Sequence, residues 1–401
     1  MKLIGKVIIA CIVTTASWSQ VLTKEDSLTA GLIARPDATV LSGYGSFRYT
    51  NNVTTENAEA NVDRVVLFLG HKFSNKISFF SEMELENAKL TGGAGSGEFS
   101  MEQAFIKFNL NRSTYLTAGL FIPRIGIINE NHLPNTYNGA TRPLVETLVI
   151  PSTWREIGVG IYGYSNKVPG LNYSFALVNG LNAAAFTNGS GIREGRFEGR
   201  NANASSLALT GALLQYIGNF RLQCSAYLGG SAGLSKRAAD SLQLNAGAFG
   251  TPVALTEINA QYTHKRWYAK VLATFMTIPD AAKINQAYAN NTALQSFGAY
   301  AEVAYTFWKK DAAQMRYFAR YETLDLNAKL PENGVINPTL KQQYLVTGIS
   351  FLPVAGVIVK VDYVYRLTGN QNPNLVVDPY PVGLPYFTKQ HAINIGLGYS
   401  F

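Results

Sequence analysis

Cysteine and charge are both scarce in this sequence of 401 residues. Only two cysteines occur, and Cys11 lies in an N-terminal segment that we expect to be removed, so Cys224 is left alone. A single thiol excludes intrachain disulfide bonds and Cys-based metal sites. Charged residues make up 15% of the chain, whereas globular proteins average about 25%. The composition is therefore unusual for a soluble protein.

Histidine is also rare, and common metal-binding motifs are missing. The four histidines are His71, His132, His264 and His391. His264 and His391 lie near the ends of expected strands, where an interfacial position is more common than catalysis, and His132 lies beside Glu130 and Asn131. No zinc-type histidine motif or EF-hand loop occurs. We therefore predict no catalysis, no cofactor and no metal site.

Clusters of basic residues are absent as well. The formal net charge is +8, and it falls to +6 when Lys2 and Lys6 are removed with the N-terminal segment. The remaining lysines and arginines are spread along the chain, with no basic block of the kind that binds nucleic acid. The sequence therefore predicts no nucleic-acid partner.

Apolar runs that could form a membrane-spanning helix do not occur after the first 19 residues. Such a helix needs about 20 apolar residues. Residues 1–19 have a basic start, an apolar middle and small residues near Ser19, which predicts a secretory signal peptide cut near that position. A retained anchor, or a lipoprotein modified at Cys11, is the alternative. We expect residues 20–40 to form a short periplasmic segment.

Aromatic residues and alternating patterns are abundant. The chain holds 22 Tyr and 21 Phe, and many segments of about ten residues alternate apolar with polar or small residues. This period of two is typical of strands with one apolar face. We expect sixteen strands: 41–49, 64–73, 77–86, 99–110, 114–122, 156–164, 171–178, 206–216, 220–228, 255–264, 267–277, 296–307, 314–324, 342–351, 357–368 and 390–401.

The connections between these strands alternate between short and long. Turns such as "GN" at Gly218–Asn219 and "KR" at Lys265–Arg266 contrast with long connections rich in Gly, Asn and Pro. Short periplasmic turns and long external loops are typical of outer-membrane barrels, whereas a soluble β-sandwich would not alternate so regularly. We therefore predict an all-β, transmembrane antiparallel barrel of about sixteen strands over residues 41–401.

One face of several strands carries charge. A charge facing lipid near the midplane costs about 2–4 kcal/mol, so these side chains should face the lumen. A barrel of about sixteen strands is wide enough for an aqueous channel. The alternative is that the charges pair with one another and only brace the wall. The residues that we expect to line the pore are Lys270, Arg316, Arg320, Lys360 and Arg366.

The third external loop, between Ile122 and Glu156, is unusually apolar. An apolar loop must pack against something, and the lumen is the available place. We therefore expect an inward-folded third loop that narrows the pore. The alternative is a loop folded over the rim or against a neighbouring subunit. The charged residues expected to line or brace the constriction are Arg124, Glu130, Arg142, Glu146, Arg155 and Glu156.

The same region resembles a known family. The stretch "GLFIPRIGIINENHLPNTYNGATRPLVETLVIPSTWREIGVGIYG", together with "SFFSEMELENAKL" and "MEQAFIKF" upstream, is similar to the phosphate-selective porin O/P-like family of Gram-negative outer membranes. The resemblance implies a sixteen-stranded trimeric channel with an inward third loop. Its motif positions here are Asn129, Glu130, Asn131, Pro134, Glu146, Pro151, Trp154, Arg155 and Glu156.

The closing segment "NIGLGYSF" resembles the C-terminal signal that the barrel-assembly machinery binds. Ile393, Ile395 and Leu397 alternate with small or polar residues, as expected for a strand that faces lipid on one side. The positions that match the assembly signal are Asn394, Gly396, Tyr399 and Phe401.

Together these features predict an outer-membrane porin of a Gram-negative bacterium. We expect a homotrimer surrounded by outer-membrane lipid, through which small hydrophilic or anionic solutes diffuse passively with a weak anion preference. The luminal arginines form no clear ladder, so phosphate specificity is less favoured. Two further hypotheses are a channel specific for a sugar or peptide, and a structural or adhesive barrel without conductance.

Overall fold

The computed structural model describes residues 38–87, 98–375 and 386–401. The predicted signal peptide and most of the predicted segment 20–40 lie outside these residues. The strands are β1 (Thr39–Asn52), β2 (Asn57–Lys72), β3 (Ile77–Glu86), β4 (Phe99–Asn109), β5 (Thr114–Phe121), β6 (Glu156–Tyr164), β7 (Leu171–Asn179), β8 (Leu207–Ile217), β9 (Phe220–Gly230), β10 (Pro252–His264), β11 (Trp267–Thr277), β12 (Gln295–Lys310), β13 (Ala313–Lys329), β14 (Lys341–Val354), β15 (Val357–Thr368) and β16 (Lys389–Ser400).

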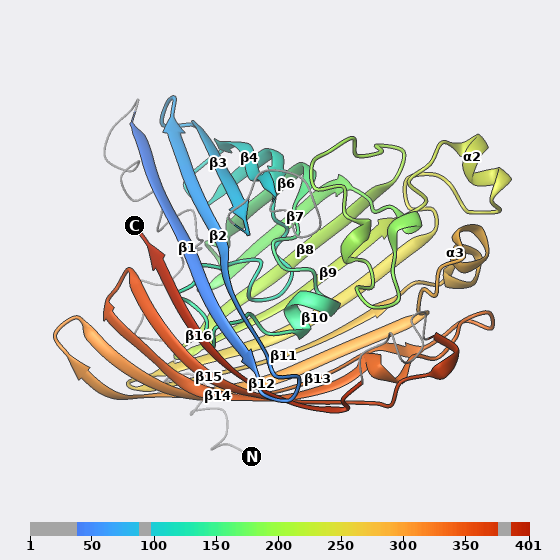
Figure 1. Cartoon of the computed structure of the whole chain (residues 1–401). Coiled ribbons are helices and arrows are strands. Elements are labelled where there is room, and N and C mark those ends of the chain that lie inside the picture. The colour runs from blue at the N-terminus through green and yellow to red at the C-terminus, as the bar shows by residue number, and fades with distance from the viewer. Residues whose placement is uncertain (1–37, 88–97, 376–385) are drawn as a thin grey trace, which may run out of the picture.

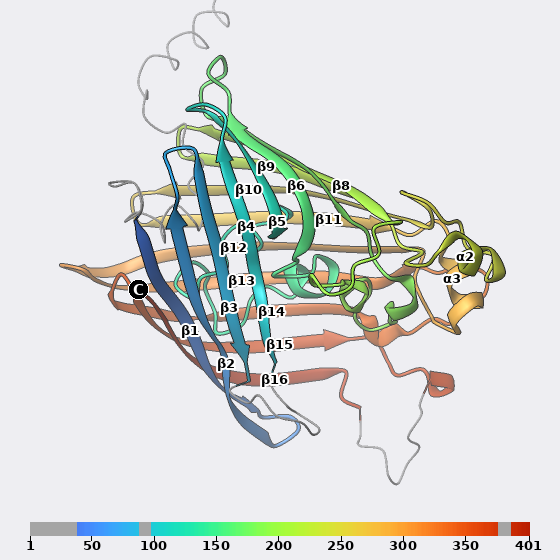
Figure 2. The ribbon, with the colours of Figure 1, turned by 90° about the horizontal axis from the view of Figure 1, so that it is seen from above.

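These strands form one closed antiparallel barrel, in which each strand pairs with its neighbours in the sequence (Figures 1 and 2). The barrel closes where β1 pairs with β16, with Tyr44 opposite Ser400 and Asn52 opposite Ala392. The predicted all-β fold is thus confirmed, because every predicted strand corresponds to one of the sixteen that the structure describes.

The first connection differs from the prediction. A long loop was expected after residue 49, but β1 and β2 continue as a hairpin until Asn52 lies opposite Asn57. A β-bulge near Ser46 and Phe47 shifts the register within this hairpin. The bulge interrupts the alternation of residues in β2, and this hid the strand's first residues from a pattern of period two.

The two ends of the barrel differ in their connections. At the short-turn end, Gly218 has a φ of 56° and Lys265 a φ of 55°, the left-handed conformation that two-residue hairpin turns require. The long-loop end holds helices α2 (Lys236–Ser241) and α3 (Ala281–Tyr288) and the short helical turns η4 (Ala183–Ala185), η5 (Arg193–Gly195), η6 (Pro338–Leu340) and η7 (Pro373–Leu375). Helices α2 and α3 lie side by side in Figure 2, at the end opposite the C-terminus.

Asparagine side chains join the connections at the long-loop end. Asn188, after β7, donates to the carbonyl of Asn291, after β11, at 2.6 Å. Asn337, after β13, donates to the amide oxygen of Asn188 at 3.3 Å, and Asn333 donates to the carbonyl of Ala282 in α3 at 2.8 Å. These hydrogen bonds hold three connections together over one side of the barrel mouth.

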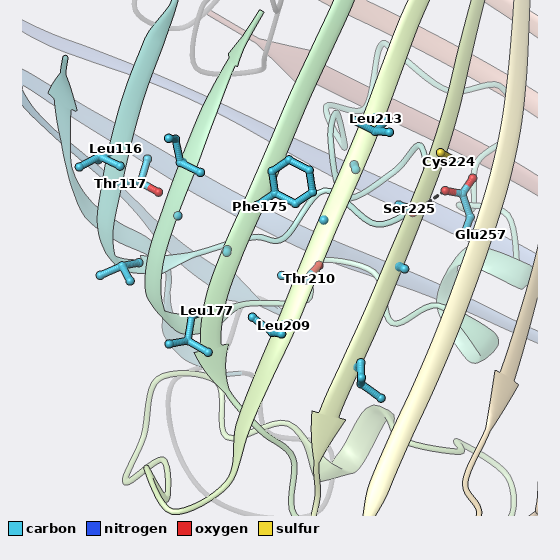
Figure 3. Close-up of a pocket in the computed structure, with 18 of the residues that line it drawn as sticks. Leu116, Thr117, Phe175, Leu177, Leu209, Thr210, Leu213, Cys224, Ser225 and Glu257 are labelled. Carbon is cyan, nitrogen blue, oxygen red and sulfur yellow. Dashed lines mark hydrogen bonds between the residues drawn. The ribbon is translucent and has the colours of Figure 1, made fainter. Parts of the chain in front are cut away.

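The outward face of the wall is apolar. Residues such as Leu213, Phe175 and Ile258 are exposed, as the alternating pattern predicts for a surface in contact with lipid. Across β4 to β10 this face contains an apolar depression of about 990 Å³ (Figure 3). Separately, no helix among the described residues is long and apolar enough to cross a membrane.

Candidate functional site

Residues 122–155, here called loop 3, connect β5 to β6 and fold into the barrel. Figure 1 shows this segment inside the ring of strands. Most of its apolar side chains are buried, with Ile125, Val145 and Trp154 all 0% exposed. Residues Val145–Val149 form a turn of π-helix, η3, that lies against β12 and β13. The predicted inward-folded third loop is therefore confirmed.

Glycines on the inner wall make room for loop 3. A Cβ atom on Gly298 of β12 would lie 2.8 Å from Cγ1 of Val145, and one on Gly398 of β16 would lie 2.5 Å from Cβ of Pro134. Gly396 faces Ala140 in the same way. The small residues that alternate through the last strand thus allow the loop backbone to approach the wall closely.

A charged anchor attaches the middle of loop 3 to the wall. Lys270, Glu302 and Arg320 lie opposite one another on β11, β12 and β13. Nζ of Lys270 is 3.4 Å from Glu302, and Arg320 contacts Glu302 at 3.0 Å and Glu322 at 2.8 Å. Arg320 also donates to the carbonyl of Asn138 in loop 3 at 3.1 Å. We call Lys270, Glu302, Arg320 and Glu322 the charged anchor.

Carboxylates of the wall also accept hydrogen bonds from the loop backbone. The amide of Leu144 donates to Glu322 at 2.6 Å, and the amide of Ala140 donates to Asp362 of β15 at 2.6 Å. Beside Asp362, Lys360 lies over the ring of Tyr137, with Nζ 3.7 Å from the ring centroid. Acidic side chains thus receive donors that would otherwise be buried without partners.

Glu146 performs the same task within loop 3. Its carboxylate accepts from the amides of Ile127 and Ile128 at 2.6 and 2.7 Å, and from the hydroxyl of Tyr300 at 2.6 Å. Burial raises the pKa of this carboxyl above its ordinary value, although these hydrogen bonds act in the opposite direction. Glu146 therefore joins the two halves of the loop to each other and to β12.

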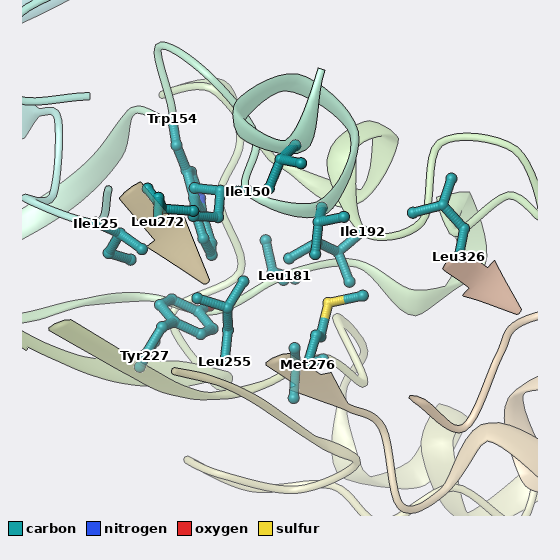
Figure 4. Close-up of a cluster of buried hydrophobic side chains, with 14 of the residues drawn as sticks. Ile125, Ile150, Trp154, Leu181, Ile192, Tyr227, Leu255, Leu272, Met276 and Leu326 are labelled. Atoms are coloured by element: carbon teal, nitrogen blue, oxygen red, sulfur yellow. The ribbon is translucent and has the colours of Figure 1, made fainter. Parts of the chain in front are cut away.

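An apolar anchor attaches the two ends of loop 3. Figure 4 shows Ile125, Ile150 and Trp154 packed against inward side chains of β9 to β11 and against the connection after β7. The indole of Trp154 lies 4.6 Å from the ring of Tyr227, and its Nε1 donates to Glu156 at 2.7 Å. The wall is apolar here because loops cover it. The wall members of this apolar anchor are Tyr227, Leu255, Leu272 and Met276.

Three other charged residues of loop 3, Arg124, Glu130 and Arg155, also have partners. Arg155 donates to Glu198 at 2.7 Å and lies 3.9 Å from Glu84. Glu130 forms an ion pair with Arg221 of β9. Arg124 donates to the hydroxyl of Tyr115 at 3.1 Å, and its guanidinium lies over the ring of Tyr162.

The predicted pore-lining residues divide into two groups. The first group is buried where loop 3 meets the wall: Glu130, Glu146, Arg155, Lys270, Arg320 and Lys360. The second group is only half-buried: Arg124, Arg142, Arg316 and Arg366. The part that either group plays in permeation stays a prediction.

The predicted assembly signal lies on both faces of β16. Asn394 donates to Asp362 inside the barrel at 2.8 Å, and Gly396 faces loop 3. The rings of Tyr399 and Phe401 are stacked, with centroids 6.4 Å apart, and Phe401 is 69% exposed. Recognition by the assembly machinery stays a prediction.

A further luminal cluster was missed in the sequence. Glu102 of β4 lies beside His132 of loop 3 and Tyr44 of β1. The adjacent polar residues Glu102 and Gln103 interrupt the alternation of their strand, and this break could have indicated a β-bulge. The contact with His132 could not be inferred, because it depends on the path of loop 3.

The chain has a relative of similar sequence, although no protein-family model matches it. An uncharacterized protein of Aquifex aeolicus (strain VF5) is 30% identical over 338 residues, which cover 81% of this chain and 74% of that protein.

Three solved structures show the same kind of barrel. OmpF of Salmonella typhi, in complex with daunomycin, matches with a TM-score of 0.56 and 12% identity over 91% of this chain and 98% of that one. The trimer form of OmpT of Vibrio cholerae matches with a TM-score of 0.54 and 8% identity over 92% and 100%. An anion-selective porin from Comamonas acidovorans matches with a TM-score of 0.52 and 11% identity over 91% and 100%. At these identities the likeness establishes a porin-like fold.

Proposed function

We propose that this chain, which belongs to the same family as the Aquifex aeolicus protein and has a porin-like barrel, is an outer-membrane channel for small hydrophilic solutes with a weak anion preference. The resemblance to outer-membrane porins supports the location. A homotrimer is part of the proposal, supported by the trimer form of OmpT. Native mass spectrometry of the detergent-extracted protein tests it.

The proposed anion preference is based on the charge of the half-buried luminal residues. Within the part of the chain that the structure describes, Arg142, Arg316 and Arg366 take part in none of the ion pairs. By contrast, the half-buried acids Asp63 and Glu86 pair with Arg48 and Arg64. The net field along a solute path would therefore be positive, which attracts anions.

Single-channel recording in a planar bilayer tests this function. We expect a steady conductance whose reversal potential in a KCl gradient shows a weak preference for chloride. Arg316→Gln combined with Arg366→Gln should move the reversal potential toward cation preference. Lys309→Gln, which removes an exposed lysine near the short-turn end of β12, is the matched control and should change it less. Equal shifts in both variants would contradict the assignment.

Phosphate specificity, which the family resemblance suggested, is a more specific alternative to a general channel with a weak anion preference. It rests on the same arginines, and it predicts that micromolar phosphate blocks the chloride current. Addition of phosphate during the same recording separates it from a general channel.

A second candidate function is a structural barrel without conductance. The observation that favours it is the charged anchor, whose members are at most 3% exposed because loop 3 covers them. A loop held this firmly across the lumen could close it. A correctly folded barrel that shows no conductance would support this function over the channel.

A further inference from the structure

The exposed charges at the two ends of the barrel differ in sign balance. Among the described residues, the short-turn end exposes seven basic side chains and one acidic side chain, that of Asp311, whereas the long-loop end exposes seven basic and six acidic side chains. The short-turn end therefore has a local net charge of +6, and the long-loop end is close to neutral at +1. We call the seven basic side chains of the short-turn end the basic ring: Lys76, Arg112, Lys167, Lys265, Arg266, Lys309 and Lys310.

The turns that carry the basic ring contact one another along the rim of the barrel. The hydroxyl of Tyr164, at the end of β6, donates to the carbonyl of Arg112 at 3.2 Å, so Arg112 and Lys167 lie on adjoining connections. The amide of Thr306 donates to the carbonyl of Arg266 at 2.8 Å, which places the turn between β10 and β11 beside the end of β12. The basic side chains thus belong to one continuous belt.

The charges of the basic ring are not compensated by acidic side chains elsewhere in the described part of the chain. None of its members forms an ion pair with another described residue. By contrast, Lys283 at the long-loop end pairs with Asp280 at 3.4 Å. Seven exposed charges of one sign on the same rim create a positive potential that attracts anions.

Each of the short turns also carries or adjoins an exposed apolar side chain. Trp267 directly follows Arg266, and Trp308 directly precedes Lys309. A water-soluble anionic partner would leave these apolar groups without an apolar environment. The boundary of a bilayer accepts both, because apolar side chains enter the hydrocarbon while cationic tips reach the headgroups. The seven apolar residues, all at least 39% exposed, are Phe73, Leu110, Val168, Ile217, Trp267, Trp308 and Val354.

We propose that the basic ring binds the phosphate groups of anionic phospholipids in the leaflet at the short-turn end. This inference rests on the proposed membrane location of the barrel, but it does not depend on conductance. A lysine or arginine near an anionic lipid surface strengthens binding about fivefold. The ring should therefore gather anionic lipids around one end of the barrel, while the nearly neutral long-loop end exerts no comparable attraction.

Quenching of tryptophan fluorescence by brominated lipids tests the proposal, because Trp267 and Trp308 lie beside the basic ring. Trp154, which is 0% exposed inside the barrel, should contribute a constant background. The full chain without its predicted signal peptide is refolded into phosphatidylcholine vesicles that contain equal fractions of brominated phosphatidylglycerol or brominated phosphatidylcholine. We expect the phosphatidylglycerol to bind beside the tryptophans about fivefold more tightly, and this preference should fall as NaCl is raised.

Two matched variants locate the source of the preference, and heat-dependent migration on gels reports whether each has folded. The ring variant, which should lose the preference, combines Lys265→Gln, Arg266→Gln, Lys309→Gln and Lys310→Gln. The control variant, which should keep it, combines the long-loop substitutions Lys236→Gln, Arg237→Gln, Lys329→Gln and Lys341→Gln.

The quenching experiment also separates failure of this inference from failure of the proposed function. Strong and equal quenching by both brominated lipids in the parent protein would overturn the inference in favour of a water-soluble acidic partner and leave the membrane location intact. A preference that the folded ring variant keeps would also overturn the inference. Absence of quenching by either lipid would overturn the membrane location as well.

Discussion

The charged anchor and the apolar anchor hold the same loop to neighbouring strands, but they differ in how they respond to change. The charged anchor places Arg320 between Glu302 and Glu322 at 3.0 and 2.8 Å and directs it to one carbonyl of loop 3. The apolar anchor packs Ile150 and Trp154 against apolar side chains, and its directional contact is the hydrogen bond from Trp154 to Glu156 at 2.7 Å. Directional contacts define a position, whereas apolar burial contributes stability in proportion to area. The charged anchor should therefore fix the course of the loop, and the apolar anchor should supply most of its binding energy.

The largest effect should come from breaking the charged anchor on one side. Arg320→Met leaves Glu302 and Glu322 buried beside a neutral side chain, which should destabilise the barrel by about 3–5 kcal/mol. Urea unfolding in lipid vesicles measures this loss. Adding Glu322→Gln removes the uncompensated charge, because Glu302 keeps Lys270 as its partner at 3.4 Å, and should restore part of the stability. A single variant as stable as the parent would remove the distinction between the anchors.

A smaller effect should follow from pushing loop 3 away from the wall. In Gly298→Val the new side chain would overlap Val145 and Val149 of η3, and overpacking of this kind costs about 1–3 kcal/mol. The same urea measurement reports the cost, and single-channel conductance reports whether the displaced loop widens the path. Gly189→Val is the control, because nothing lies within 4 Å of a Cβ at Gly189.

Trimming the apolar anchor should cost less. Ile150→Val removes one buried methylene group and should lower the free energy of unfolding by about 0.5–1.5 kcal/mol, with conductance unchanged. Ile336→Val makes the same chemical change at a residue that is 60% exposed and should have little effect. A changed conductance in Ile150→Val would mean that the apolar anchor also sets the course of the loop.

The smallest effect should come from the protonation of Glu146, which makes the stability of the barrel depend on pH. Burial raises the pKa of its carboxyl, so the folded protein holds this proton more tightly than the unfolded chain does. The resulting stability is present in full below the unfolded pKa and is lost as the pH rises through the folded pKa. Glu146→Gln should remove this part of the dependence when urea midpoints are compared across that range. An unchanged pH profile would argue against the raised pKa.

The strands could be predicted because alternation in the sequence directly records which face meets lipid. On β15, Val361 and Tyr363 are exposed outward while Lys360 and Asp362 are buried inward, as the period of two indicates. The inward course of loop 3 could be predicted for a similar reason, since its isoleucines and valines need an apolar environment. Both inferences depend only on local composition.

The partners inside the lumen could not be predicted, because they depend on register and on the path of loop 3. Lys270, Glu302 and Arg320 are far apart in the sequence and become neighbours only through the pairing of β11, β12 and β13. The bulge at Glu102 reverses the face expected for one residue of β4. Residues predicted to face water, such as Arg320, are instead covered by a loop whose contacts no periodic pattern records.

The pairing of β1 with β16 also constrains the order of events during folding. The backbone of Phe401 exchanges hydrogen bonds with Gly43 at 2.9 and 3.1 Å, so the last residues of the chain complete a ring that the first strand began. Contacts between such distant segments form late, because their closure costs the most chain entropy. Loop 3 faces Gly396 and Gly398 on this last strand. Its insertion and the closure of the ring should therefore be coupled steps, and slow insertion would delay completion of the whole barrel.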